Sequence, residues 1–243
     1  MHYTFSSAKK GLGEKVRSLN TRNSDQQLII TQRVGVMGGT FDPIHYGHLV
    51  IAEEVLATLD LSEVVFIPAG QPPHKVGHAV TEVHHRLAML ELALATNPYF
   101  RISHIEIERN GPSYTVDTLQ TLHDQWSTNT ALYFIIGWDS LEDLHTWYRA
   151  ADLLTLVTHL VAVKRPGYEE DAEYIKVLEQ RLPGIRQRLL VIPAPQLEIS
   201  ATDLRRRVAE GRPIKYQTPE AVETYIKKNG LYQSNGERKE EQQ

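Results

Sequence analysis

The stretch "RVGVMGGTFDPIHYGHL", residues 33–49, joins a short apolar run to a dense group of turn-forming and polar residues. The run "RVGVMGG" ends in two glycines, which is typical of a buried parallel strand. The Asp42-Pro43 pair forms turns and ends a strand. The next residues place apolar side chains on one face of a helix: Leu49, Ala52, Leu56 and Leu59. This order predicts the first β–α unit of an α/β fold.

Strand and helix patterns alternate along the rest of the chain. The apolar runs predict further strands at 63–68, 100–107, 131–137, 159–167 and 188–195. Helical patterns lie at 83–94, after a predicted cap at Ser113, at 202–210 and at 219–228. The alternation predicts a mostly parallel sheet with helices on both faces and a small C-terminal helical segment. Such sheets bind ligands at the carboxyl ends of their strands.

Composition restricts the classes of function. The 243 residues are 41% hydrophobic and 23% charged, as in an ordinary globular protein. The net charge of -4 argues against nucleic-acid binding through a broad basic face. Cysteine is absent, which excludes disulfides, thiolate metal sites and cysteine nucleophiles. No apolar run approaches the ~20 residues that cross a bilayer, so no membrane partner is expected.

The chain is expected to contain one domain, at residues 33–232. Residues 1–32 are rich in serine, asparagine and basic side chains and have no apolar core for a secretory signal, so we predict a flexible N-terminal extension of a cytoplasmic protein. A transit peptide is the alternative, and Glu14 and Asp25 argue against it. Residues 233–243 are expected to form a solvated tail.

The residues after the first strand are suited to an anionic ligand. Gly38 and Gly39 let the backbone approach a ligand, and Thr40 adds a hydroxyl donor. His45 precedes the predicted helix and His48 lies in its first turn, near the positive end of the helix dipole. Donors gathered at a helix N-terminus suit a phosphate. Metal binding by the two histidines is less favoured, since no third ligand has zinc-site spacing, and a purely structural pair is the other alternative.

These residues resemble the HxGH signature of the nucleotidyltransferase superfamily. The fuller series is similar to the bacterial nicotinate-nucleotide adenylyltransferases over about residues 33–232. It comprises "GGTFDPIHYGHL", "PAGQPPHK", "PSYTVDTL", "GWDSLEDLHTWY", "RPG", "EISATDLRRRV" and "VETYIKKNGLY". The resemblance implies a Rossmann-like sheet and transfer of AMP from ATP to nicotinate mononucleotide, with release of pyrophosphate. It also implies Mg²⁺ with ATP, and self-association of the chain is possible.

The resemblance assigns roles to individual residues. It implies catalytic contacts with the reacting phosphates for His45, His48, Lys75 and Arg205. It implies contacts with ATP for Gly38, Gly39, Thr40, Phe41, Gly137, Asp139, Ile199, Ser200 and Thr202. It implies contacts with the nicotinate nucleotide for Thr115, Trp147 and Tyr148, with the ring stacked on Trp147.

Each role has a simpler alternative. Lys75 is otherwise a loop cation, Arg205 part of an exposed helix face, and Asp139 and Thr115 helix caps. Trp147 and Tyr148 are otherwise ordinary core or surface aromatics. Ala201 replaces a serine that is usual in the family, which predicts weaker ATP binding. The rival functions are transfer to nicotinamide mononucleotide, phosphopantetheine or a choline-type phosphate, and non-catalytic nucleotide binding.

Overall fold

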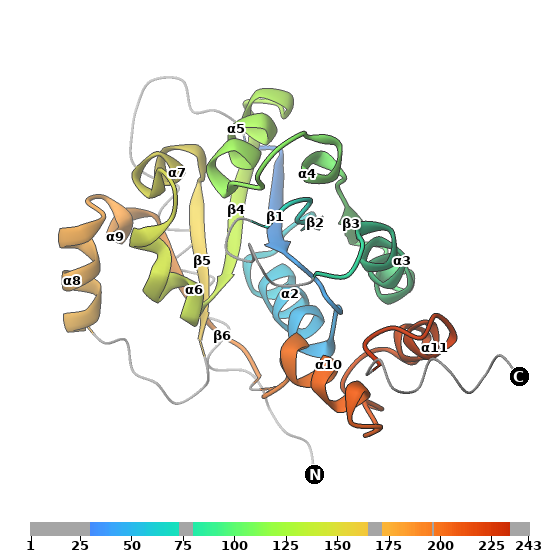
Figure 1. The fold of residues 1–243 in the computed structure, drawn as a ribbon. Helices are drawn as coiled ribbons and strands as arrows, with labels where there is room; N and C mark the ends of the chain where they lie inside the picture. Colours follow the sequence, from blue (N-terminus) through green and yellow to red (C-terminus); the bar gives the residue numbers. More distant parts are fainter. Residues whose placement is uncertain (1–29, 73–79, 165–171, 196, 234–243) are drawn as a thin grey trace, which may run out of the picture.

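The computed structural model describes residues 30–72, 80–164, 172–195 and 197–233 (Figure 1). Six strands form one sheet in the order β3-β2-β1-β4-β5-β6, and every neighbouring pair is parallel. The strands are β1 (Gln32–Gly39), β2 (Glu63–Pro68), β3 (Phe100–Ile102), β4 (Thr130–Gly137), β5 (His159–Lys164) and β6 (Leu189–Pro193). The predicted parallel sheet is therefore confirmed, and β1 begins one residue before the predicted domain boundary.

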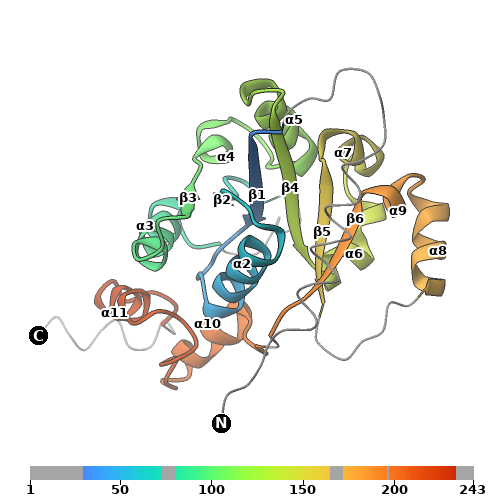
Figure 2. The same cartoon turned by 180° about the vertical axis from the view of Figure 1, so that it is seen from behind.

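Helices cover both faces of the sheet (Figure 2). One face carries α2 (Tyr46–Leu59), α3 (Val83–Leu94), α10 (Ala201–Ala209) and α11 (Glu220–Lys228). The other face carries α5 (Thr115–Gln125), α6 (Trp138–Asp143), η2 (Leu144–Thr146), α7 (Ala150–Leu156), α8 (Ala172–Arg181) and α9 (Ile185–Arg188). None of the helices in the described ranges is long and apolar enough to cross a bilayer.

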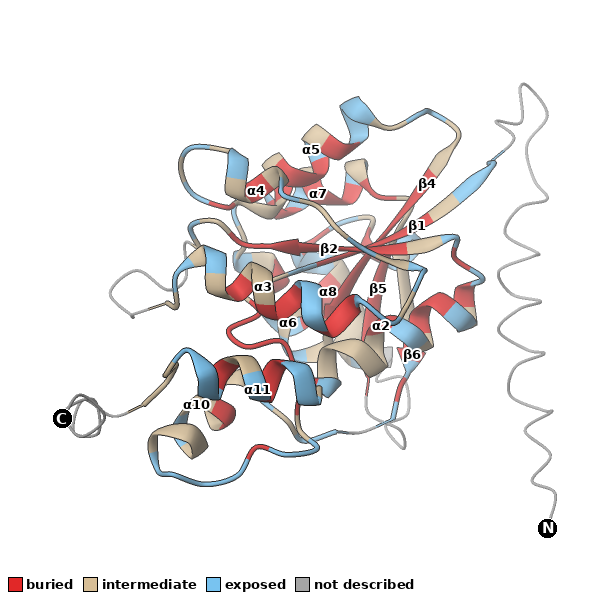
Figure 3. Cartoon of the chain, turned by 90° about the vertical axis from the view of Figure 1, so that its right-hand side faces the viewer, coloured by how far each residue is buried: buried red, intermediate tan, exposed pale blue. Residues whose placement is uncertain are grey.

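Alternation along the strands supplies a separate core to each face. The central strands are buried along most of their length (Figure 3). In β4, Tyr133 and Ile135 pack into the core beneath α2, α3, α10 and α11. Phe134 and Ile136 point the other way, into the core beneath α5 to α9. Because successive strand side chains face opposite sides, a strand buried on both faces is apolar throughout. This is why "ALYFIIG" was recognisable as a strand.

The predicted strand at 100–107 is wrong in its second half. β3 ends at Ile102, and residues Ile105–Glu108 form the short helix α4. The carbonyl of His104 accepts hydrogen bonds from the amides of Ile107 and Glu108, which closes the helical turn. Glu106 is buried, with its carboxylate bonded to Thr118 of α5. A short apolar–polar alternation does not distinguish a strand from one buried helical turn. Here the hydrogen bond between Glu106 and Thr118 favours the helical turn.

The predicted cap at Ser113 is also wrong. Helix α5 begins at Thr115, with Tyr114 as its N-cap residue and no side-chain cap. The Ser113 hydroxyl instead accepts hydrogen bonds from the backbone amides of Gly70 and Gln71, at 3.0 and 3.1 Å. Ser113 therefore ties the residues that follow β2 to the start of α5, although they are more than 40 positions apart.

The direction of chain progression through the sheet reverses between β1 and β4. The chain moves outward from β1 through β2 to β3, then crosses to β4 and continues to β6. At this point the helices that leave β1 and β4 lie on opposite faces, and a crevice opens at the carboxyl ends of the two strands. Gly38 and Gly39 end β1 and Gly137 ends β4, so the motif residues lie at this point.

We expect Gly70→Ala to destabilise the fold. A Cβ atom at Gly70 would lie 2.3 Å from the backbone oxygen of Glu106. Because the neighbouring atom belongs to the backbone, it cannot move away as the end of a flexible side chain could. The strain is expected to lower the free energy of unfolding by ~1–3 kcal/mol in a urea titration. Gly38→Ala is the control, because a Cβ there has no neighbour within 4 Å. Equal urea midpoints for the two variants would contradict the close approach.

Candidate active site

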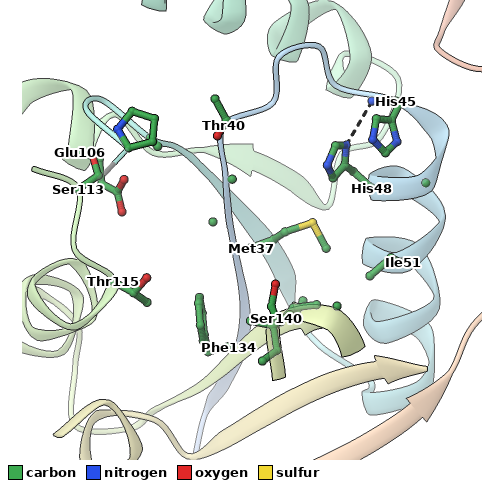
Figure 4. Close-up of a pocket in the computed structure, with 18 of the residues that line it drawn as sticks. Met37, Thr40, His45, His48, Ile51, Glu106, Ser113, Thr115, Phe134 and Ser140 are labelled. Carbon is green, nitrogen blue, oxygen red and sulfur yellow. Dashed lines mark hydrogen bonds between the residues drawn. The ribbon is translucent and has the colours of Figure 1, made fainter. Parts of the chain in front are cut away.

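A cavity of about 450 Å³ lies where the sheet order reverses (Figure 4). The ends of β1 and β4, the first turn of α2, the start of α5 and the segment after β6 form its walls. The structure brings nine of the predicted residues to this cavity: Gly38, Gly39, Thr40, His45, His48, Thr115, Gly137, Trp147 and Ile199. These residues come from segments far apart in the chain.

A second cavity of about 440 Å³ adjoins the first. Ile51, Gly137 and Ile199 line both cavities, so the two are halves of one elongated site. Two further predicted residues, Asp139 and Ser200, line the second cavity together with the buried Lys164. Asp139 lies in the first turn of α6, and the N-cap position of that helix is occupied by Gly137. The capping alternative for Asp139 is therefore wrong.

The two histidines form one packed unit at the N-terminus of α2. His45 is the N-cap residue, and the rings of His45 and His48 stack with their centroids 3.7 Å apart. The backbone N–H of His45 donates to Nδ1 of His48 at 3.3 Å, drawn as a dashed line in Figure 4. Since Nδ1 accepts, a neutral His48 carries its proton on Nε2 and can donate it to a ligand.

Both imidazoles are neutral in the free protein near pH 7. Burial lowers the pKa of His45 to about 4. Burial, and secondarily the neighbouring His45, lowers the pKa of His48 well below its usual value. His45 Nδ1 is buried and makes no hydrogen bond to any described residue. The pair thus offers hydrogen-bond donors at the positive end of the α2 dipole, without a full positive charge.

Gly47, between the two histidines, is required by the packing. A Cβ atom at this position would lie 2.9 Å from Nδ1 of His45 and 3.0 Å from its Cε1. The ring of His45 therefore leaves no room for a side chain at this position. Phe41 packs against the pair: its buried ring meets that of His48 edge-on, with the ring centroids 5.1 Å apart. Because the Phe41 side chain lies in the core, the predicted contact with ATP would have to come from its backbone.

The chain is similar in sequence to known proteins of one family. Residues 36–207 match the family model described as cytidylyltransferase-like. The chain is 50% identical over 202 residues to a probable nicotinate-nucleotide adenylyltransferase of Thermomicrobium roseum, which covers 83% of this chain and 92% of that protein. It is 53% identical over 199 residues to another from Roseiflexus sp. strain RS-1, covering 82% and 97% of the two chains. The chain belongs to the nicotinate-nucleotide adenylyltransferases of the cytidylyltransferase-like family.

A solved structure shares the fold of this adenylyltransferase-family chain. It is the Plasmodium falciparum nicotinic acid mononucleotide adenylyltransferase complexed with NaAD. The TM-score is 0.67 at 21% identity, and the match covers 83% of this chain and 97% of the other. The likeness confirms the predicted Rossmann-like architecture.

In this family member, the residues predicted to bind the nicotinate nucleotide separate into two groups. Thr115 and Trp147 line the first cavity, and the Trp147 ring meets Phe134 edge-on at 6.3 Å. Tyr148 does not line either cavity. The residue is 54% exposed, and its ring packs against that of Tyr114 with the centroids 4.5 Å apart.

The predicted phosphate-binding residues of the C-terminal segment lie at the α10 N-terminus. Ser200 is the N-cap of α10, and its hydroxyl accepts from the amide of Asp203 at 3.1 Å. Arg205 donates to the carbonyl of Asp42 at 2.6 Å and to the Thr202 hydroxyl at 3.2 Å. Neither Thr202 nor Arg205 lines either of these two cavities. Lys75 lies outside the described residues.

Sequence reasoning missed Glu106 as a cavity residue. Its carboxylate points into the first cavity beside Ser113 (Figure 4) and accepts from the Thr118 hydroxyl at 2.7 Å. Burial raises the pKa of Glu106, while its hydrogen bonds to Thr118 and Ser113 and the charge of Arg109 oppose the rise. The available signal was the position of Glu106 between two isoleucines. On the predicted strand this glutamate would have faced solvent, so the pattern did not indicate a buried carboxylate.

We expect the depressed pKa of His45 to make stability depend on pH. The unfolded chain binds a proton at this histidine near pH 6.5, whereas the folded protein binds it only near pH 4. Unfolding therefore takes up a proton between these values, and stability falls as the pH falls. Urea titrations at pH 7 and pH 4.5 are expected to show the wild type losing about 2 kcal/mol more than His45→Asn. Equal losses in both proteins would contradict the neutral, buried His45.

Proposed function

We propose that this protein transfers AMP from ATP to nicotinate mononucleotide, forming nicotinate adenine dinucleotide and pyrophosphate in the biosynthesis of NAD. The observation that carries the proposal is the neutral His45–His48 pair at a helix N-terminus, inside a two-part cavity. Relatives that share 50% and 53% of their residues with this chain over most of both lengths are named for the same reaction, which supports the proposal. Two adjoining cavities suit two nucleotide substrates held end to end.

The reaction joins two phosphates and needs no covalent intermediate on the protein. An ionised oxygen of the nicotinate mononucleotide phosphate attacks the α-phosphorus of ATP. A new P–O bond forms, the bond to the bridging oxygen of pyrophosphate breaks, and its electron pair leaves with pyrophosphate. The acceptor is already an anion at neutral pH, so no general base is required. The protein contributes alignment and stabilisation of the charge that builds up on the phosphates.

The described residues divide this work between the two halves of the site. We place the phosphates of ATP against Gly38, Gly39, Thr40 and the N-terminus of α2. There His48 donates a hydrogen bond from Nε2. Adenosine occupies the second cavity, beside Gly137, Asp139, Ile199 and Ser200. Nicotinate mononucleotide occupies the first cavity, beside Thr115 and Trp147. Contacts from Phe41, Lys75, Tyr148, Thr202 and Arg205 stay predictions.

Mg²⁺ fits this site as an ion that arrives with ATP. Among the described residues, no group of three or more histidine, cysteine, aspartate or glutamate side chains could hold a metal. Mg²⁺ is often held by substrate phosphates and water with few protein ligands, so the absence of such a cage here is compatible with it. When bound, the ion neutralises negative charge on the phosphates. Cytoplasmic location, self-association and the absence of a nucleic-acid partner stay predictions from the sequence.

We expect nicotinate mononucleotide to be used at least ~10-fold better than nicotinamide mononucleotide, in kcat/KM. The positive end of α5 meets the first cavity at Thr115, where it favours a carboxylate over a neutral amide. An amide also turns one acceptor oxygen into a donor, and a buried polar group left unpaired costs about 1–3 kcal/mol. Pyrophosphate release with each acceptor, and with phosphopantetheine, measures the preference. Equal use of the two pyridine nucleotides would contradict the assignment of a carboxylate-binding pocket. Activity with phosphopantetheine alone would overturn the proposed function.

Replacement of His48 by alanine is expected to lower kcat by ~10²–10³ while the protein stays folded. One preorganised donor to the charge that develops in the transition state has about this effect. His84→Ala is the matched control, because His84 is exposed on α3 and lines neither cavity. Circular dichroism and the melting temperature check the fold of both variants. A His48→Ala enzyme with nearly normal turnover would exclude His48 from the mechanism.

A further inference from the structure

The turn between β1 and α2 is held from outside by the C-terminal segment of the chain. Both sides of His45 are tied to residues more than 160 positions away. The hydrogen bonds are Tyr46 N–H to the Gln217 carbonyl (3.0 Å), Thr218 Oγ1 to the Ile44 carbonyl (2.8 Å), Arg205 Nη1 to the Asp42 carbonyl (2.6 Å) and Tyr232 Oη to Asp42 Oδ1 (2.6 Å). The turn that carries the histidines is therefore shaped by contacts that are not local.

Asp42 is the centre of these contacts. It is buried, with 2% of its surface exposed, and both of its carboxylate oxygens are used. Oδ1 accepts from the Tyr232 hydroxyl, and Oδ2 accepts from the backbone N–H of Thr81 at 3.2 Å. A buried carboxylate needs such donors, because removing one leaves a desolvated charge without compensation. The position of Asp42 therefore depends on each of them.

A buried arginine completes the support beneath the turn. Arg86 donates from Nη1 to the Thr40 carbonyl and from Nε to the Thr81 carbonyl, both at 2.9 Å. Between Thr40 and Asp42, Phe41 has φ of +48°, a left-handed conformation that costs energy for a residue with a side chain. Such a conformation persists only where its surroundings hold it. Arg86, Asp42 and the C-terminal segment supply that constraint.

We propose that Tyr232 is a positioning residue for adenylyl transfer: its hydroxyl holds Asp42, and through Asp42 the turn that presents His45 and His48 to the phosphates. The inference rests on the proposed function for its kinetic consequence. Tyr232 lines neither cavity, so its role in the site is indirect. The proposal assigns the motif "VETYIKKNGLY" a function in addition to packing. A displacement of the turn by a fraction of an ångström would move the donors from the positions that the reacting phosphates require.

A second tyrosine of the same segment offers a matched control. The Tyr225 hydroxyl, on α11, is hydrogen-bonded to Nδ1 of His85 on α3 at 2.9 Å. Both Tyr225 and Tyr232 pack against the core beneath α2 and α3. Replacing either by phenylalanine removes one hydroxyl: at Tyr225 its hydrogen bond to His85, and at Tyr232 its hydrogen bond to Asp42 and a longer contact with Met89 Sδ at 4.0 Å. Only the hydroxyl of Tyr232 reaches the turn.

The first experiment compares Tyr232→Phe with Tyr225→Phe in the full chain. We expect Tyr232→Phe to lower kcat by about 10-fold or more, with KM for both substrates within about twofold of the wild type. Tyr225→Phe is expected to keep kcat within about twofold. Tyr232→Phe is expected to lower the melting temperature more than Tyr225→Phe, because it removes a donor from the buried carboxylate of Asp42. Turnover is therefore compared at a temperature at which circular dichroism shows both variants to be folded.

The second experiment tests whether the effect passes through Asp42. In a double-mutant cycle, Tyr232→Phe is expected to lower kcat much less in an Asp42→Asn background than in the wild type, because the two residues share one contact. Amide hydrogen exchange in residues 40–46 is expected to be faster in Tyr232→Phe than in Tyr225→Phe. The exchange measurement requires no reaction, so it tests the positioning role even if the proposed function fails.

Three outcomes would overturn the inference. The first is a Tyr232→Phe enzyme with full kcat and unchanged exchange in residues 40–46. The second is an equal loss of kcat in Tyr225→Phe, which would indicate a general packing effect. The third is additivity of the Tyr232→Phe and Asp42→Asn effects on kcat. Absence of pyrophosphate release by the wild type with every acceptor would overturn the proposed function instead, and the exchange result alone would then decide the inference.

Discussion

The hydrogen bond from the His45 backbone N–H to Nδ1 of His48 is the constraint on which the site depends. It satisfies a donor at the helix N-terminus, selects the tautomer of His48 and brings the two rings into a stack at 3.7 Å. The position of the His45 ring explains why Gly47 has no side chain, and burial of the rings explains why both are neutral. A cation at this position would attract phosphate more strongly, but a neutral donor can bind phosphate without first losing or gaining a proton.

The sheet places this unit where two nucleotides can meet. Reversal of the strand order between β1 and β4 opens a crevice at their carboxyl ends, and the helix that follows β1 directs its N-terminus into it. Pro195, Leu197 and Ile199, which follow β6, line both of the adjoining cavities. Ser113 joins the loop after β2 to the start of α5, and Glu106 joins α4 to α5, so this side of the first cavity is held by hydrogen bonds as well.

Much of the fold was predictable because its signals are local. Continuous apolar runs identified the strands from 63–68 and 131–137, and the helix at 83–94 agrees with α3 at both ends. The histidine-bearing turn was also predictable, since glycines, Asp42-Pro43 and two histidines occur within eleven residues. The errors at 100–107 and at Ser113 share one cause. In both places a polar side chain forms a hydrogen bond with a distant part of the chain, and local periodicity carries no trace of that partner.

The sequence by itself determined the parallel α/β architecture and the family to which the chain belongs, and it predicted that residues 38–48 bind phosphate. Strand periodicity, turn chemistry and the helix dipole are properties of neighbouring residues, so they are present in the linear chain. The tertiary structure alone decided that the histidines are neutral, because burial sets their pKa values. It alone placed Glu106 in the cavity and Tyr232 on Asp42, a pair separated by 190 positions. Burial and long-range hydrogen bonds exist only when the whole chain has folded, and they determine how the site residues are held.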